Sequence, residues 1–217
     1  DGPSDAAPPL VFVHGWADSS EVWREAATQL AIRHRVISWD LRGHGRSSAP
    51  PAGHYDRDRA LADLGTVLRT SGTPAVLVGH SLGGYLALAY TILHPDEVAA
   101  IVLVGAGPGF RSPVSMEKWN ASVDRSAREL GVPPGQEAIS KHVDSFVFDH
   151  LADITCPVLV IIGERDKRFA ASAEVFANTL DVRSTVVVPD AGHMVHLKQP
   201  AAVAAAIASF YDDVTGN

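Results

Sequence analysis

The residue whose surroundings best fit covalent chemistry is Ser81, in the pattern Gly79-His80-Ser81-Leu82-Gly83. A short apolar run, residues 75–78, precedes this pattern, and an Ala- and Leu-rich segment, residues 82–93, follows it. The run is typical of a buried parallel strand, and the segment is typical of a helix. On so sharp a turn the serine is pushed out at the carboxyl end of the sheet, and the flanking glycines leave room for the turn. We therefore predict that Ser81 is a catalytic nucleophile on a nucleophile elbow.

Two later loops carry the acid and the base that a nucleophilic serine needs. A serine hydroxyl attacks poorly until a base removes its proton, and the base needs a carboxylate that holds its tautomer. In strand–turn–helix serine enzymes these partners follow the serine as acid and then histidine. Asp166 follows an apolar strand at 158–162, and His193 follows another at 184–188. The order and placement predict a triad of Ser81, Asp166 and His193.

Each of the last two assignments has a neighbouring competitor. Glu164 competes with Asp166 but lies closer to the end of its strand. His196 competes with His193, which is favoured because the tight turn at 190–192 would direct it inward. We interpret Asp190 as a residue that caps or orients that turn.

The oxyanion formed during attack requires backbone N–H donors that already point at it. One donor is expected from Leu82, directly after the nucleophile. The second is expected from the loop His14-Gly15-Trp16, most simply the N–H of Trp16, with Gly15 permitting a close backbone approach. His80 is interpreted as structural, with a hydrogen bond inside the elbow.

Apolar strands that alternate with helices predict an α/β fold with a mostly parallel sheet covered on both faces. The sequence favours strands at 10–13, 35–39, 75–78, 100–104, 158–162 and 184–188. It favours helices at about 19–32, 56–70, 82–93, 116–130, 136–150, 171–180 and 200–212.

The alternation stops between the fourth and fifth strands. We therefore divide the chain into a core, residues 1–108 and 153–217, and a small helical lid, residues 109–152. This insertion leaves from the edge of the sheet that carries Ser81, so we expect it to lie above that serine. Its aromatic and aliphatic side chains favour an uncharged substrate, since burying an unpaired charge is costly. The residues expected to bind substrate are Trp16, Met116, Trp119 and Phe146.

The overall composition excludes several classes of protein. The chain has 217 residues, 46% hydrophobic and 20% charged, which suits a globular domain with a sizeable core. A net charge of −7 argues against nucleic acid or an anionic membrane as the main partner. The single cysteine, Cys156, excludes an internal disulfide and is interpreted as a buried structural thiol. We expect a cytoplasmic protein with a small-molecule substrate, no metal and no membrane span.

These motifs together resemble the α/β-hydrolase superfamily, in particular its lipase/esterase and haloperoxidase-like branch. The motifs that carry the resemblance are His14-Gly15-Trp16, Asp40-x-Arg42-Gly43-x-Gly45-x-Ser47, Gly79-His80-Ser81-Leu82-Gly83-Gly84, Gly163-x-x-Asp166 and Gly192-His193. The resemblance implies the α/β-hydrolase fold, an acyl-enzyme mechanism and no cofactor. It also implies a packing role for the Asp40–Ser47 motif.

The chain departs from this family at its beginning. Relatives usually open with an antiparallel hairpin before the His-Gly strand, for which the first nine residues are too few. Either N-terminal strands are missing from this sequence, or the strand at 35–39 lies near an exposed edge of the sheet, where pairing with a second chain is possible. The protein is expected to be a monomer or a homodimer.

Several functions are compatible with this site. The first is hydrolysis of small to medium neutral carboxylic esters, lactones or thioesters. The second is C–C bond hydrolysis or cofactor-free perhydrolysis on the same triad. The third is a ligand-sensing receptor that retains a slow triad. The serine at position 81 argues against dehalogenases and epoxide hydrolases, which resemble this fold but carry aspartate there.

Overall fold

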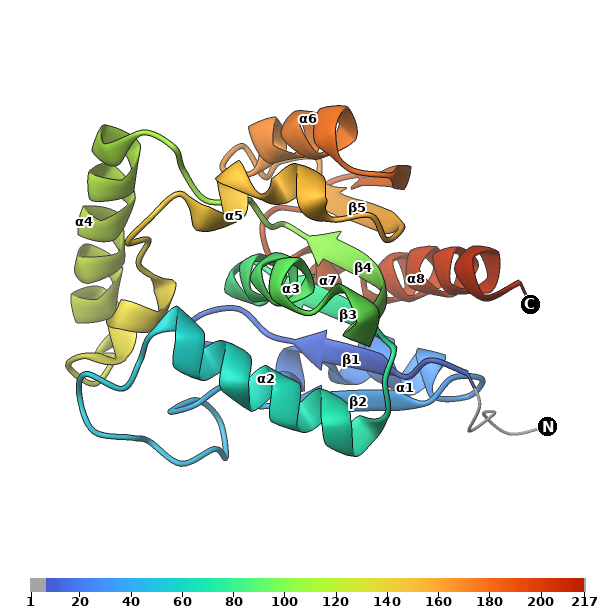
Figure 1. Cartoon of the computed structure of the whole chain (residues 1–217), viewed down its shortest axis with the longest axis horizontal. Helices are drawn as coiled ribbons and strands as arrows, with labels where there is room; N and C mark the ends of the chain where they lie inside the picture. Colours follow the sequence, from blue (N-terminus) through green and yellow to red (C-terminus); the bar gives the residue numbers. More distant parts are fainter. Residues whose placement is uncertain (1–6, 217) are drawn as a thin grey trace.

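Six parallel strands form one sheet in the part of the chain that the computed structural model describes, residues 7–216 (Figure 1). Their order across the sheet is β2-β1-β3-β4-β5-β6. The strands are β1 (Leu10–Val13), β2 (Val36–Trp39), β3 (Ala75–His80), β4 (Val98–Val104), β5 (Val158–Gly163) and β6 (Val182–Val188). The predicted α/β class and all six predicted strands are confirmed, with some boundaries extended by one or two residues.

The central strands are buried on both faces, and the two edge strands are not. Every residue of β1, β3 and β5 is buried, whereas β2 and most of β6 remain partly exposed. Apolar residues throughout a strand are what a sheet covered on both sides requires. The expectation that the strand at 35–39 lies at the sheet edge is confirmed, because β2 is an edge strand.

Helices cover both faces of the sheet. One face is covered by α2 (Arg57–Ser71), α3 (Leu82–Leu93) and α6 (Ala170–Thr179). The other is covered by a 3-10 turn at Ser20–Trp23, α1 (Arg24–Leu30), α7 (Val195–Lys198) and α8 (Pro200–Thr215). Another 3-10 turn, Pro95–Glu97, precedes β4. None of the helices within residues 7–216 has the length and apolar character needed to cross a bilayer.

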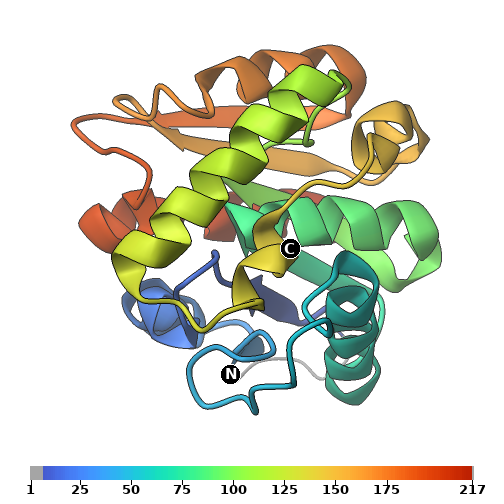
Figure 2. The same cartoon turned by 90° about the vertical axis from the view of Figure 1, so that its left-hand side faces the viewer.

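The segment between β4 and β5 begins with the long helix α4 (Pro113–Leu130). This helix lies across the carboxyl ends of the strands, at the left of Figure 1 and across the front of Figure 2. Pro113 occupies the first helical position, where its missing N–H costs nothing, and the hydroxyl of Ser112 caps the first turn. The predicted helix at 116–130 is therefore confirmed.

The predicted second helix at 136–150 is wrong. The segment instead contains a 3-10 turn (Gln136–Ser140), an extended stretch, the short helix α5 (Phe146–Asp149) and a 3-10 turn (Leu151–Asp153). The side chain of Asn120 accepts from the amide of His142 and donates to its carbonyl, at 2.9 and 2.8 Å. Both the N–H and the C=O of His142 are thus hydrogen-bonded to a side chain of α4. They are not available for helical hydrogen bonds, so this stretch does not form a helix.

Candidate active site

Ser81 occupies a strained turn between β3 and α3. Its φ of 51° and ψ of −114° lie where a residue with a side chain is rarely found. A Cβ atom at Gly79 would lie 2.4 Å from the carbonyl oxygen of Gly83, and one at Gly83 would lie 2.2 Å from that of Val13. The two glycines are therefore a steric requirement of the turn. Strain of this kind persists only where the surrounding structure enforces it, and it gathers at functional sites.

The carboxylate of Asp166 and the ring of His193 form a hydrogen-bonded pair. His193 Nδ1 lies 2.9 Å from Asp166 Oδ2, and the Asp166 side chain is only 2% exposed. Because the carboxylate accepts from Nδ1–H, the proton of the neutral ring resides on Nδ1 and leaves Nε2 free to act as a base. Gly105 passes directly beside the pair, since a Cβ there would lie 3.2 Å from Asp166 Oδ2 and from His193 Nδ1.

The competing residues lie elsewhere. Glu164 is exposed and its carboxylate accepts from the amide of Asp190 at 3.0 Å. Asp190 occupies a left-handed position in the turn and pairs with Arg165. His196 is 1% exposed, and burial lowers its pKa to about 3. The structure thus pairs Asp166 with His193 and leaves Glu164 at the surface and His196 in the interior.

His80 supports the loop that carries His193. Its Nε2 lies 3.1 Å from the backbone oxygen of His193, so it donates across to that loop and not within the elbow as predicted. The ring is 1% exposed, and burial lowers its pKa well below the ordinary value for histidine. A neutral His80 therefore connects the turn that carries Ser81 with the turn that carries His193.

Two histidines hold the loop that is predicted to supply the oxyanion donors. His14 Nδ1 donates to the oxygen of Gly15 at 2.7 Å, and its Nε2 accepts from the amide of Leu41 at 2.9 Å. His44 Nε2 accepts from the amide of Ala17 at 3.2 Å. A Cβ on Gly15 would lie 2.8 Å from the ring of His80 and 3.4 Å from Cβ of Ser81. The ring of His80 therefore leaves room only for glycine at this position, and the backbone of the loop passes beside the serine.

The Asp40–Ser47 motif holds the other side of this loop. The buried carboxylate of Asp40 accepts from the amides of Ser20 and Arg46 at 2.7 and 2.9 Å. A Cβ on Gly45 would lie 2.4 Å from Cγ of Asp40, so a larger residue would displace the carboxylate. Burial by itself would raise the pKa of Asp40, but the hydrogen bonds from Arg46 and Ser20 outweigh it and lower the pKa. The motif packs two turns together around one ionised carboxylate.

Asp40→Asn is expected to lower the free energy of unfolding by about 1–3 kcal/mol at pH 7, because one amide donor would then face an NH2 group. The folded-state pKa is depressed, so this stabilisation is present above about pH 4 and is lost as the pH falls through the folded pKa. Urea unfolding of the wild type and of Asp40→Asn at a series of pH values measures this difference in the free energy of unfolding. Arg46→Ala, which keeps the backbone donor and removes an exposed side chain, should change little. Equal losses in both variants would contradict this account.

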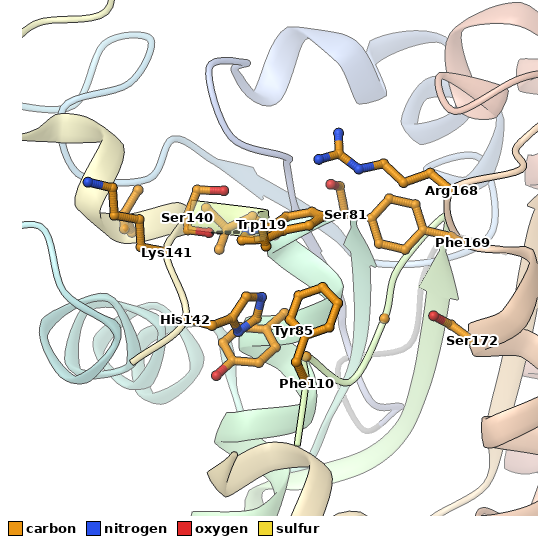
Figure 3. A pocket seen from close by; sticks show the side chains of 14 residues that line it. Ser81, Tyr85, Phe110, Trp119, Ser140, Lys141, His142, Arg168, Phe169 and Ser172 are labelled. Carbon is orange, nitrogen blue, oxygen red and sulfur yellow. Dashed lines mark hydrogen bonds between the residues drawn. The ribbon is translucent and has the colours of Figure 1, made fainter. Parts of the chain in front are cut away.

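A small cavity of about 80 Å³ opens beside Ser81 (Figure 3). The residues that line it come from the elbow and α3, from the segment between β4 and β5, and from the loop after β5 and the start of α6. They are Ser81, Leu82, Tyr85, Gly107, Gly109, Phe110, Trp119, Ile139, Ser140, Lys141, His142, Arg168, Phe169 and Ser172. Ser81 and Leu82, the first residue of α3, thus line a cavity whose wall holds both apolar and polar side chains.

One of the four residues predicted to bind substrate lines this cavity. Trp119 does so, and its Nε1 donates to the oxygen of Ser140 at 2.8 Å. Trp16, Met116 and Phe146 lie outside the lining. Phe146 packs under the guanidinium of Arg57, 5.0 Å from its ring centroid. It therefore helps to hold the segment on α2.

Sequence reasoning missed most of the cavity wall. Phe169 stacks on the ring of His193 with centroids 4.9 Å apart and planes 13° apart. The guanidinium of Arg168 lies 4.2 Å from the ring centroid of Trp119. Both residues follow Asp166 in the same loop, and that adjacency was the signal available in the sequence. Within residues 7–216, no group of three His, Cys, Asp or Glu side chains is arranged to hold a metal ion.

Residues 8–130 match the model of the family described as alpha/beta hydrolase fold. This match covers more than half of the chain and agrees with the sheet, the elbow and the paired acid and base. The chain belongs to the alpha/beta hydrolase family.

Similar proteins include enzymes with different named reactions. A putative non-heme haloperoxidase of Mycobacterium phage D29 is 34% identical over 149 residues, which span 67% of this chain and 52% of that protein. A putative 2-succinyl-6-hydroxy-2,4-cyclohexadiene-1-carboxylate synthase of Bacillus subtilis is 25% identical, over 92% of this chain and 88% of its own. The structure of an esterase from Thermogutta terrifontis has a TM-score of 0.79 at 25% identity, covering 98% of this chain and 91% of that one.

Proposed function

We propose that this protein is a serine hydrolase that cleaves small to medium, neutral carboxylic esters through an acyl-enzyme intermediate. The observation that carries the proposal is the hydrogen-bonded pair of buried Asp166 and half-buried His193 at the same sheet edge as the strained Ser81. A positioned carboxylate, a histidine with a free Nε2 and an exposed hydroxyl are the parts that acyl transfer requires. The similarity to a solved esterase supports the same reaction class.

Acylation uses the histidine first as a base and then as an acid. Ser81 Oγ attacks the carbonyl carbon of the ester, and His193 Nε2 takes the hydroxyl proton. Asp166 stabilises the resulting imidazolium through Nδ1–H, and the amides of Leu82 and Trp16 hold the oxyanion. The tetrahedral intermediate collapses, His193 protonates the leaving alcohol, and the acyl group remains on Ser81.

Deacylation repeats these steps with water. His193 Nε2 takes a proton from the water molecule as it attacks the acyl carbonyl, and the same amides hold the second oxyanion. Collapse breaks the bond to Ser81 Oγ, which recovers its proton from His193, and the carboxylic acid leaves. The amide of Leu82 is suited to its role because the first turn of a helix leaves its N–H groups without helical partners.

The proposal includes residues 109–152 as a small lid that encloses the acyl group. Trp119 and His142 of this segment line the cavity beside Ser81. The segment is attached to the core by the two hydrogen bonds of Arg57 to the carboxylate of Asp144, at 2.7 and 2.9 Å. A bidentate pair of this kind fixes orientation as well as distance. The lid therefore sets the size of the group that can be bound.

Catalytic efficiency is expected to rise over the first few carbons of a straight acyl chain and then to level or fall. Each buried CH2 group contributes about 0.8 kcal/mol, and a cavity this small encloses only a few of them. Values of kcat/KM for p-nitrophenyl esters from acetyl to palmitoyl measure the profile. A maximum at sixteen carbons would contradict the proposal. A requirement for a carboxylate-bearing substrate would also contradict it and would indicate a role for Arg168, a charged residue of the lining.

The same assay separates an enzyme from a ligand-sensing receptor. A receptor with a slow triad would release close to one equivalent of p-nitrophenol for each protein molecule, whereas an esterase continues to a steady state. Steady turnover that depends on Ser81 would support the enzyme.

A further inference from the structure

The lid places one histidine, His142, inside the cavity. Its backbone is held by the side chain of Asn120 through both the amide and the carbonyl. Trp119, the neighbour of Asn120 on α4, binds the oxygen of Ser140 on the same stretch. Three hydrogen bonds from one turn of α4 thus set the position of residues 140–142. The His142 side chain is 8% exposed and forms part of the cavity wall.

The ring of His142 lies among aromatic side chains (Figure 3). Tyr85, Phe110 and Trp119 meet it edge to face, with ring centroids 4.6, 5.2 and 5.7 Å away. Nδ1 is buried, and no residue in the described part of the chain forms a hydrogen bond with it. A Cβ on Gly109 would lie 3.1 Å from this nitrogen, so Nδ1 packs against the backbone of Gly109. Nε2 is not buried in this way, and it is the ring nitrogen that a group in the cavity can reach.

The imidazole of His142 is uncharged at neutral pH. Burial lowers its pKa to about 4; the nearby charge of Asp144 raises this pKa and that of Arg57 lowers it, both less than burial. A neutral imidazole offers one donor and one acceptor. It can therefore satisfy a hydroxyl, a carbonyl or an amide, and it provides no charge to compensate a carboxylate. The aromatic ring walls around it likewise favour an uncharged group.

We propose that His142 is a specificity-determining residue that hydrogen-bonds an uncharged polar substituent on the acyl group of the substrate. This rests on the proposed function, in which the acyl group attached to Ser81 occupies the cavity. The preferred substrates are then esters of hydroxy or oxo acids whose polar substituent reaches the lid. The rest of the acyl group contacts Tyr85, Phe110 and Trp119. The substituent binds Nε2, to which no residue in the described part of the chain forms a hydrogen bond.

The test compares esters that differ only in this substituent. The pairs are p-nitrophenyl butyrate with p-nitrophenyl β-hydroxybutyrate, and p-nitrophenyl pentanoate with p-nitrophenyl levulinate. Wild-type kcat/KM is expected to be about tenfold higher for the polar member of at least one pair, the size of one neutral hydrogen bond. His142→Phe should lower kcat/KM for the polar member of the pair more than for the plain ester, so that the preference is lost. His142→Gln, which retains a donor and an acceptor, should keep part of the preference.

His150→Phe provides the matched control. His150 belongs to the same lid but is exposed and pairs with Asp153, so the preference should be unchanged. A wild-type protein without any preference would overturn the inference, whether or not the variants fold. So would a His142→Phe variant that loses activity equally on both members of each pair, because a merely structural role predicts that result. If turnover does not depend on Ser81, the proposed function fails; if it does and no preference exists, only this inference fails.

Discussion

Ser81→Ala is expected to abolish ester turnover and labelling by a fluorophosphonate probe, and to leave the fold intact. The hydroxyl forms the bond to the acyl group, so its removal stops the covalent route altogether. In serine hydrolases this loss lowers kcat by about 10⁶-fold, and the residual rate comes from the oxyanion donors and binding. Alanine keeps the Cβ atom that the turn already accommodates at a φ of 51°. The midpoint of thermal unfolding should therefore change little.

Ser172→Ala is the control for this experiment. Ser172 lines the same cavity but comes from α6, away from the elbow. Its hydroxyl has no part in the proposed bond-forming step, so labelling should proceed at close to the wild-type rate. Time courses of probe incorporation, read by mass spectrometry, compare the variants. A Ser81→Ala protein that labels as fast as the wild type would remove Ser81 from the role of nucleophile.

The elbow and the strands that support it could be predicted because they depend on neighbouring residues in the sequence or on runs of apolar residues. The need for Gly79 and Gly83 arises from contacts within the turn and with the neighbouring strand β1. A continuous apolar run indicates a strand that is buried on both faces of a sheet, and every residue of β3 and β5 is buried. Order along the chain led to the loops that hold Asp166 and His193, because the loops after successive parallel strands meet at one edge. The tight turn at 190–192 and the distance from the end of the strand then favoured these two residues over His196 and Glu164.

The second half of the segment between β4 and β5 and the cavity wall could not be predicted, because they depend on contacts between distant segments. The apolar spacing around Phe146 resembles a helix, but the backbone of His142 is bound by Asn120, twenty-two residues earlier. The hydrogen bond from His80 likewise reaches a loop 113 residues later in the chain. A sequence pattern shows which residues are apolar, and it does not show whether Phe146 faces the core or the cleft.

Asp166→Asn is expected to lower kcat by about 10⁴-fold with the fold intact. The carboxylate accepts Nδ1–H of His193 across 2.9 Å, which leaves Nε2 unprotonated and able to take the proton of Ser81 in the proposed mechanism. An asparagine that presents its NH2 group to Nδ1 favours the other tautomer, with the proton on Nε2, and this ring cannot accept the proton of Ser81. The loss should appear in kcat for p-nitrophenyl butyrate, with thermal unfolding as the check that the buried substitution is tolerated.

Glu164→Gln is the matched change two residues away, and we expect only a mild effect. Glu164 is exposed, and its carboxylate accepts a hydrogen bond from the amide of Asp190. The side-chain oxygen of glutamine can still accept that hydrogen bond. It orients the turn before His193 from the surface, whereas Asp166 holds the ring itself from the interior. Burial matters because a charge-assisted hydrogen bond shielded from water is stronger than one at the surface. A steep loss in Glu164→Gln beside a near-normal Asp166→Asn would transfer the role of acid to Glu164.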